Sequence, residues 1–154
     1  MNIGSLCSRR VASISESASL RDVARLMRDE QVGAVVVMRG TAPPRVVGMI
    51  TDRDILRTQL KRAADLASIS AQEAMTSDPL VFPAQEPVDG AIAHLRARGV
   101  RRAPVVAADG TLVGLISTDD LLVHLATTLI GTAGIVAQQV RRERAAEPGS
   151  RSGA

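Results

Sequence analysis

VGMITDRDI at residues 47–55 returns as VGLISTDDL at residues 113–121. Each copy runs from aliphatic residues around a glycine to a hydroxyl residue, two more residues, an aspartate and an aliphatic residue. The hydroxyl residue and the aspartate that correspond, at an offset of 66 residues, are Thr51 and Asp54 in the first copy and Ser117 and Asp120 in the second. The chain therefore repeats a structural unit, a binding site, or both.

The repeat extends upstream of these two signatures. Apolar residues recur at helical spacing after Ser19 and again after Pro87, and these helices align at an offset of 68. The turn at residues 108–111, marked by Asp109-Gly110, is shorter than the turn at residues 39–45, and a loss of two residues between the strands accounts for the change of offset from 68 to 66. The predicted strands are residues 11–15, 34–38 and 46–50 in the first unit and residues 80–83, 103–107 and 112–116 in the second.

The order strand, helix, strand, strand, helix therefore occurs twice and predicts an α/β (α+β) fold. Each unit would be a three-stranded sheet with two helices on one face. A unit of about 55 residues buries too little surface to be stable alone. We therefore expect two units packed sheet to sheet about a pseudo-twofold axis. The expected domains are residues 1–62, a linker at 63–74, residues 75–128, and a C-terminal helix extension with a disordered tail at 129–154.

Composition excludes several classes of protein. Apolar residues make up 45% of the 154 residues and charged residues 23%, which are values of globular proteins. Phe82 is the only aromatic residue, so no aromatic surface is available for stacking nucleic-acid bases. The net charge of +3 comes from arginines dispersed among sixteen acids, which makes nucleic-acid binding the weakest of the alternatives. Cys7 is the only cysteine, which excludes an internal disulfide.

Location follows from the absence of recognisable targeting patterns. The N-terminal MNIGSLCSRR lacks an apolar signal-peptide core, so we expect a cytoplasmic protein. Residues 121–140 contain no Asp, Glu, Lys or Arg, but they include His124 and several Thr, Gly and Gln residues. This stretch also begins directly after Asp119 and Asp120, inside the second signature. We therefore expect no membrane span there.

These patterns resemble a tandem pair of CBS domains, the cystathionine-β-synthase-type regulatory unit also called a Bateman module. The matching features are Met75-Thr76 before the second unit, VRRAPVV at residues 100–106, and both signatures. The resemblance covers residues 5–128. It implies a regulatory protein that binds an adenosine-containing ligand (AMP, ADP, ATP or S-adenosylmethionine) in the clefts between the repeats.

Each signature admits a structural and a functional interpretation. Thr51 with Asp54, and Ser117 with Asp120, have the spacing of a helix capping box. The start of a helix also attracts phosphate, and a carboxylate one turn inside it can accept hydrogen bonds from both hydroxyls of a ribose. The resemblance implies that the aspartate holds the ribose and that the hydroxyl residue lies beside the phosphates. A single residue can serve both purposes, so both interpretations stay open.

Arginines make the two expected clefts unequal. Arg101 and Arg102 precede Ala103-Pro104, where the resemblance implies contacts to ligand phosphates, although a solvated pair is an equally good explanation. The first unit has Gly33-Ala34 instead and carries Arg53 in its signature, where the second carries Asp119. We expect Asp120 to be the main ligand residue because Arg101 and Arg102 belong to its repeat. The expected ligand-binding residues are Thr51, Arg53, Asp54, Ser117, Asp120, Arg101 and Arg102, with Ser13, Val81 and Pro104 near the adenine.

Neither catalysis nor an obligatory cofactor is expected. His94 and His124 show no catalytic or metal-ligand spacing, and no phosphate-binding glycine motif is present. A stripe of apolar residues and two glycines, Gly131 and Gly134, predicts packing against a helix of a second copy in a homodimer. The stripe comprises Leu122, Leu125, Leu129, Ala133, Val136 and Val140. The expected function is a stand-alone sensory module that signals to an effector protein in trans, and the rival is a ligand-free dimeric scaffold.

Overall fold

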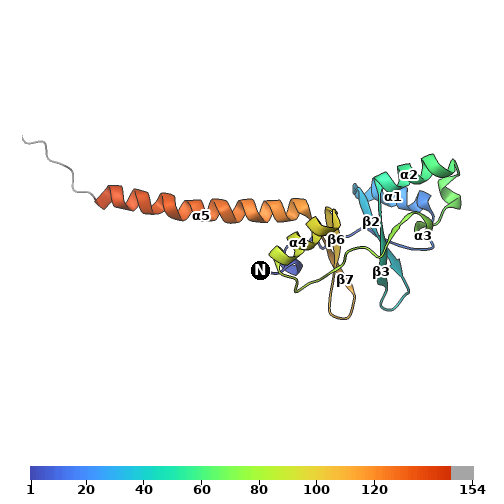
Figure 1. The fold of residues 1–154 in the computed structure, drawn as a ribbon, viewed down its shortest axis with the longest axis horizontal. Coiled ribbons are helices and arrows are strands. Elements are labelled where there is room, and N and C mark those ends of the chain that lie inside the picture. The colour runs from blue at the N-terminus through green and yellow to red at the C-terminus, as the bar shows by residue number, and fades with distance from the viewer. Residues whose placement is uncertain (147–154) are drawn as a thin grey trace, which may run out of the picture.

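The computed structural model describes residues 1–146, which form a body of two α/β units and one long helix that leaves it (Figure 1). The two sheets lie next to one another in the body. Helices α1, α2 and α3 lie beside the first sheet, and α4 lies beside the second. The tail expected at residues 148–154 lies outside the described residues.

The first unit has the predicted order of elements. Its elements are β1 (Ser13–Ser15), α1 (Leu20–Glu30), β2 (Ala34–Arg39), β3 (Arg45–Thr51) and α2 (Asp52–Arg62). Strand β1 pairs parallel with β2, and β2 pairs antiparallel with β3. Ser19 caps α1 by accepting a hydrogen bond from the Asp22 amide at 3.2 Å. The periodicity of the sequence therefore predicted this unit correctly.

The second unit repeats the same order. Its elements are β5 (Phe82–Pro83), α4 (Val88–Arg98), β6 (Arg102–Val106), β7 (Leu112–Ser117) and α5 (Thr118–Ala146). Strand β5 pairs parallel with β6, and β6 pairs antiparallel with β7. The predicted turn forms at Gly110, which has a positive φ of 85°. The opening strands β1 and β5 are shorter than the sequence predicts, because only their last residues reach the neighbouring strand.

The first sheet contains a fourth strand that the sequence pattern does not predict. Strand β4 (Thr76–Ser77) lies at the start of the second repeat, yet it pairs antiparallel with β3 of the first unit. It is preceded by η2 (Leu66–Ser68) and α3 (Ala71–Ala74), which contact α1 of the first unit. The segment that leads into the second unit therefore completes the first.

The N-terminal segment makes the equivalent contacts in the opposite direction. The short helix η1 (Ile3–Ser5) packs against the second unit, where the Ile3 amide donates to the Glu86 carbonyl at 2.9 Å. At the offset of 68, the matching bond runs from the Ala71 amide to the Ala18 carbonyl at 2.8 Å. Ser8 and Leu115 exchange two backbone hydrogen bonds. The two units thus exchange their leading segments, as a pseudo-twofold axis requires.

Each unit has its own apolar core, and each core includes a side chain from the exchanged segment. Ile3 and Cys7 lie in the core of the second unit with Phe82, Ile116 and their neighbours. Ile69 and Ala71 lie in the core of the first unit, beside Leu20 and Ile50. Ile3 is 0% exposed. Because each unit buries part of the other unit's leading segment, neither core is complete alone.

A glycine in each signature lets the exchanged segment lie on the sheet. A Cβ at Gly114 would lie 2.5 Å from Cys7 Sγ and 2.7 Å from the Ser8 carbonyl oxygen. A Cβ at Gly48, the equivalent position, would collide with Met75. The glycines in VGMI and VGLI are therefore needed for the two leading segments to pack on the sheets.

We expect Gly114→Ala to lower the free energy of unfolding by about 1–3 kcal/mol, because the added methyl group collides with backbone atoms that cannot simply move away. The matched control is Gly134→Ala on α5, where nothing lies within 4 Å of the new Cβ. That change should stabilise the helix by about 0.5–1 kcal/mol. Urea unfolding measures both, and equal effects would contradict the proposed collision.

The linker is held to α2 through Glu73. Its carboxylate accepts hydrogen bonds from Arg62 at 2.7 Å and from the Ser70 amide and hydroxyl at 2.9 Å each. The hydrogen bond from Arg62 and those from Ser70 lower the pKa of Glu73 from 4.5 to about 2.

A lowered pKa in the folded protein stabilises it above the unfolded-state pKa, and this stabilisation is lost as the pH falls through the folded-state pKa. We therefore expect Glu73→Gln to unfold at a lower urea concentration than the parent at pH 7. The difference should shrink as the pH falls from 4.5 towards 2. A difference that stayed constant over this interval would show that the carboxylate charge plays no part.

Helix α5 extends far beyond the body. Its 29 residues correspond to a length of about 43 Å. Leu121 packs into the second core with 4% exposure, whereas Leu129 is 70% exposed. Over Thr118–Ala145 the helix is long and apolar enough to cross a membrane, by length and composition only. A single such helix is a weak indication of a span.

Candidate functional site

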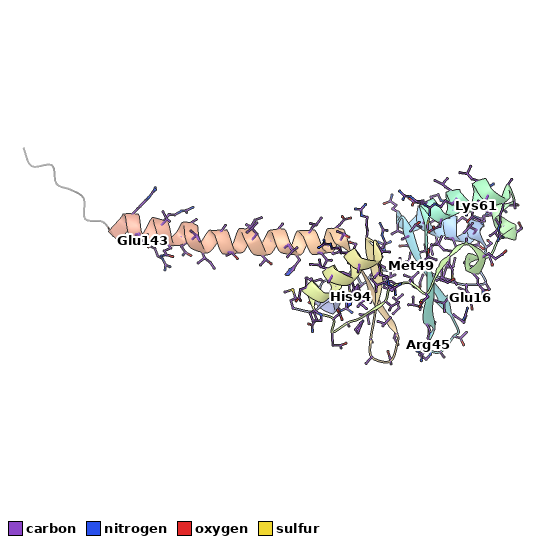
Figure 2. All side chains as sticks on the ribbon, viewed as in Figure 1. Glu16, Arg45, Met49, Lys61, His94 and Glu143 are labelled. Carbon is purple, nitrogen blue, oxygen red and sulfur yellow. The ribbon has the colours of Figure 1, made fainter. Side chains whose placement is uncertain are left out.

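A cleft of ≈ 600 Å³ opens where the first signature faces the second unit. Met49, one of its lining residues, lies at the centre of the body between the two units (Figure 2). Three segments provide the rest of the lining: the start of α2, the stretch from β4 towards β5, and the loop between α4 and β6. The lining residues are Gly33, Met49, Thr51–Asp54, Thr76–Leu80 and Arg98–Arg102.

The start of α2 brings a capped helix end to this cleft. The Thr51 amide and hydroxyl donate to Asp54 Oδ2 at 2.9 and 2.6 Å, and the Asp54 amide donates to Thr51 Oγ1 at 3.3 Å. The capping box predicted from the sequence is therefore present. All of these bonds to the carboxylate use Oδ2. A ligand hydroxyl can thus be accepted by Oδ1 without breaking the cap.

Four arginines surround this helix end. Arg53 lies in the first turn of α2, and Arg98, Arg101 and Arg102 come from the end of α4 and the start of β6. Gly99 ends α4 with a positive φ of 64°, which turns the chain back towards the sheet. The arginines outnumber the three lining aspartates, Asp52, Asp54 and Asp78, so the cleft favours an anionic ligand.

Arg101 and Arg102 lie between the two signatures. They were expected to serve Asp120 because they belong to its repeat, and in the structure they line the cleft of Thr51 and Asp54. Arg101 also lies 3.5 Å from Asp119, so it stands at the boundary between the two signatures. The pseudo-twofold axis brings this loop close to the signature of the other unit, while the Arg101 carbonyl accepts hydrogen bonds from the Thr118 amide and hydroxyl of its own unit.

Three other expected residues lie elsewhere. Ser13 is exposed on β1, and Pro104 is fully buried in β6. Val81 lines a neighbouring hollow with Arg39 and Val46. The apolar surface available to an adenine in the cleft is instead that of Met49, Pro79, Leu80 and Val100.

The second signature has the same capping geometry. The Ser117 amide and hydroxyl donate to Asp120 Oδ2 at 2.8 and 2.5 Å. Neither residue lines the cleft described above. At the offsets of the repeat, Glu30 and Asp119 stand where the first cleft has Arg98 and Arg53. Glu30 is already paired with Arg10, at 2.7 Å. The surroundings of the second signature are therefore less favourable to phosphate.

Sequence reasoning missed Arg98 and the stretch Thr76–Leu80. The repeat shows which residues of the two units are equivalent, but it does not show which unit they face. The sequence therefore could not place these residues in the cleft. Neither histidine lies in the cleft. His94, on α4, packs beside Phe82 of β5. Among residues 1–146, no group of three His, Cys, Asp or Glu side chains is placed to hold a metal ion.

Comparisons with known proteins agree with this architecture. The chain is 31% identical over 117 residues to the CBS domain-containing protein YhcV of Bacillus subtilis, covering 75% of this chain and 79% of that protein. A solved CBS domain protein, PAE2072 from Pyrobaculum aerophilum, is complexed with AMP. It is 30% identical, with a TM-score of 0.70 over 82% of this chain and 99% of that chain.

The CBS domain pair of protein MJ0100, complexed with 5-methylthioadenosine and S-adenosyl-L-methionine, has a TM-score of 0.71 over 83% of this chain and 98% of that chain. At 18% identity it shows the fold alone. The chain spans 61% of the length of an uncharacterized relative from Methanopyrus kandleri. The CBS domain family model matches residues 3–61 and again residues 71–127. The chain therefore belongs to the CBS domain family and carries a tandem pair of these domains.

Proposed function

We propose that the cleft beside α2 binds an adenosine-containing ligand and that the chain acts as a non-catalytic regulatory module. The observation that carries this proposal is the free Oδ1 of Asp54 at a capped helix start surrounded by four arginines. The helix end and the arginines suit phosphate, and the carboxylate suits the ribose hydroxyls. Adenine would lie against Met49, Leu80 and Val100.

The complex of the Pyrobaculum protein with AMP supports this choice of ligand class. The distribution of charge favours AMP, ADP or ATP over S-adenosylmethionine, because a sulfonium would gain little from the arginines. The proposed module acts in the cytoplasm on an effector protein in trans, as a homodimer. Ligand binding between two units that exchange their leading segments would alter the surface offered to that effector.

A ligand-free dimeric scaffold is the second candidate. It is favoured by one observation: both capping boxes are complete without any ligand, so the signatures are explained as helix caps. The arginines argue against nucleic acid, since many of them pair with acids on several surfaces, for example Arg21 with Asp65 and Arg39 with Glu16.

Titration calorimetry of the full chain with AMP, ATP, adenosine and S-adenosylmethionine tests the proposal. We expect the phosphate-bearing nucleotides to bind, to bind more weakly as the salt concentration rises, and to raise the unfolding temperature. No heat and no thermal shift with any of the four would favour the scaffold. Binding of adenosine as tightly as ATP would remove the role assigned to the arginines.

A further inference from the structure

The apolar stripe of α5 is exposed along most of the helix. Leu122, Leu129 and Val136 are 58%, 70% and 59% exposed, and Val140, near the far end, is 40% exposed. The body covers only the base of the helix, through Leu121 and contacts with α4 and β7. Continuous exposed apolar surface of this kind marks an interaction site.

The stripe is nearly symmetric about Gly131, in the middle of α5. Reversing the sequence about this residue exchanges Leu122 with Val140 and Leu129 with Ala133. It also exchanges Val136 with Ala126. When two copies of α5 lie side by side and antiparallel, each of these pairs brings a larger side chain of one copy against a smaller side chain of the other.

The charges at the two ends of α5 select the direction. Asp119 and Asp120 lie in its first turn, and Arg141, Arg142 and Arg144 lie near its C-terminal end. An antiparallel partner brings its arginines to the exposed Asp119, whose side chain is 74% exposed. A parallel partner would bring arginines against arginines and aspartates against aspartates.

We propose that α5 pairs with α5 of a second copy of this chain, antiparallel and centred on Gly131. Such a contact is isologous, because each copy offers the same surface to the other, and it closes at two copies. The two CBS pairs would then lie at opposite ends of the helix pair. The proposal uses none of the residues of the nucleotide cleft, so either can fail without the other.

Sedimentation velocity of the full chain at micromolar concentration, without detergent, measures the pairing. We expect a mass of two chains, falling to half with Leu129→Glu, which places a carboxylate in the middle of the stripe. The matched control is Thr127→Glu, which adds the same charge on the opposite side of α5 and should leave the mass unchanged. Circular dichroism establishes that both variants fold. A single-chain mass for the parent, or an unchanged mass for Leu129→Glu, overturns the proposal.

Orientation is tested by oxidising single-cysteine variants, since native Cys7 is buried. Leu122→Cys and Val140→Cys should form disulfide-linked pairs when the two variants are mixed, and neither should do so alone, because in the antiparallel arrangement residue 122 of one copy faces residue 140 of the other. Cross-linking of each variant alone would indicate a parallel pair and overturn the antiparallel arrangement. Flotation of the parent with phosphatidylcholine–phosphatidylglycerol vesicles would overturn the proposal in favour of a membrane-bound α5.

Discussion

Asp54→Asn lowers the affinity for AMP or ATP by about 10- to 150-fold, and this is the largest effect on binding that we expect of a single substitution. The neutral amide cannot accept both ribose hydroxyls, and it loses charge-assisted hydrogen bonds worth about 1.5–3 kcal/mol. The helix cap should suffer much less. Asp54 is the third residue of the helix, and the carbonyl oxygen of Asn can still accept from the Thr51 amide, so unfolding should change by about 1 kcal/mol or less.

Calorimetry gives the affinity, and urea unfolding of the same samples gives the stability. The matched control is Asp120→Asn, which removes the same carboxylate from an equivalent cap outside the arginine-lined cleft. We expect this control to lose as little stability as Asp54→Asn and to bind nucleotide in that cleft with unchanged affinity. Parental affinity in Asp54→Asn would leave the aspartate as a cap alone. A greater loss in Asp120→Asn would return the site to the second signature.

The repeat of the chain was predictable because its causes are local. Apolar spacing, the caps at Ser19 and Thr51 and the turn at Gly110 act within a few residues of one another. The structure confirms both units in this order. The capping boxes were predictable for the same reason, since the hydroxyl residue and the aspartate are separated by one helical turn.

The exchange of leading segments was not predictable from that local pattern. Ile3 and Ile69 are both aliphatic residues before a strand, and nothing near them in the sequence says which core they enter. The choice depends on the connection between units and on the space above Gly114 and Gly48, which only the assembled sheets define. The same limitation hid the position of Arg101 and Arg102 in the cleft of the first signature.

Helix α5 shows a third kind of outcome. Its apolar stripe and its helical extension were predicted from the sequence, and the structure has one helix from Thr118 to Ala146, although Gly131 and Gly134 ordinarily weaken a helix. The glycines remain helical in the structure. Two such residues in an otherwise good helix are tolerated more easily when packing against a partner adds to the helix's own stability.

Ile3→Ala should cost about 2–5 kcal/mol of unfolding free energy, the range found when a large buried aliphatic side chain is truncated. Ile3 is 0% exposed and packs in the second core with Phe82, more than 75 residues away in the chain. The loss should therefore affect the second unit first, and hydrogen exchange should report earlier opening of β6 and β7 than of β2 and β3.

The control for this change is Ile135→Ala, which removes the same atoms from a side chain that is 68% exposed on α5, on the side away from the stripe. Its stability should lie within about 0.5 kcal/mol of the parent. A small effect of Ile3→Ala would mean that the N-terminal segment merely rests on the second unit. A large effect confined to that unit would establish that the second CBS domain depends on the leading segment supplied by the first half of the chain. The second unit would then require residues that precede the first unit in the sequence, and cutting the chain between the repeats would leave two incomplete cores.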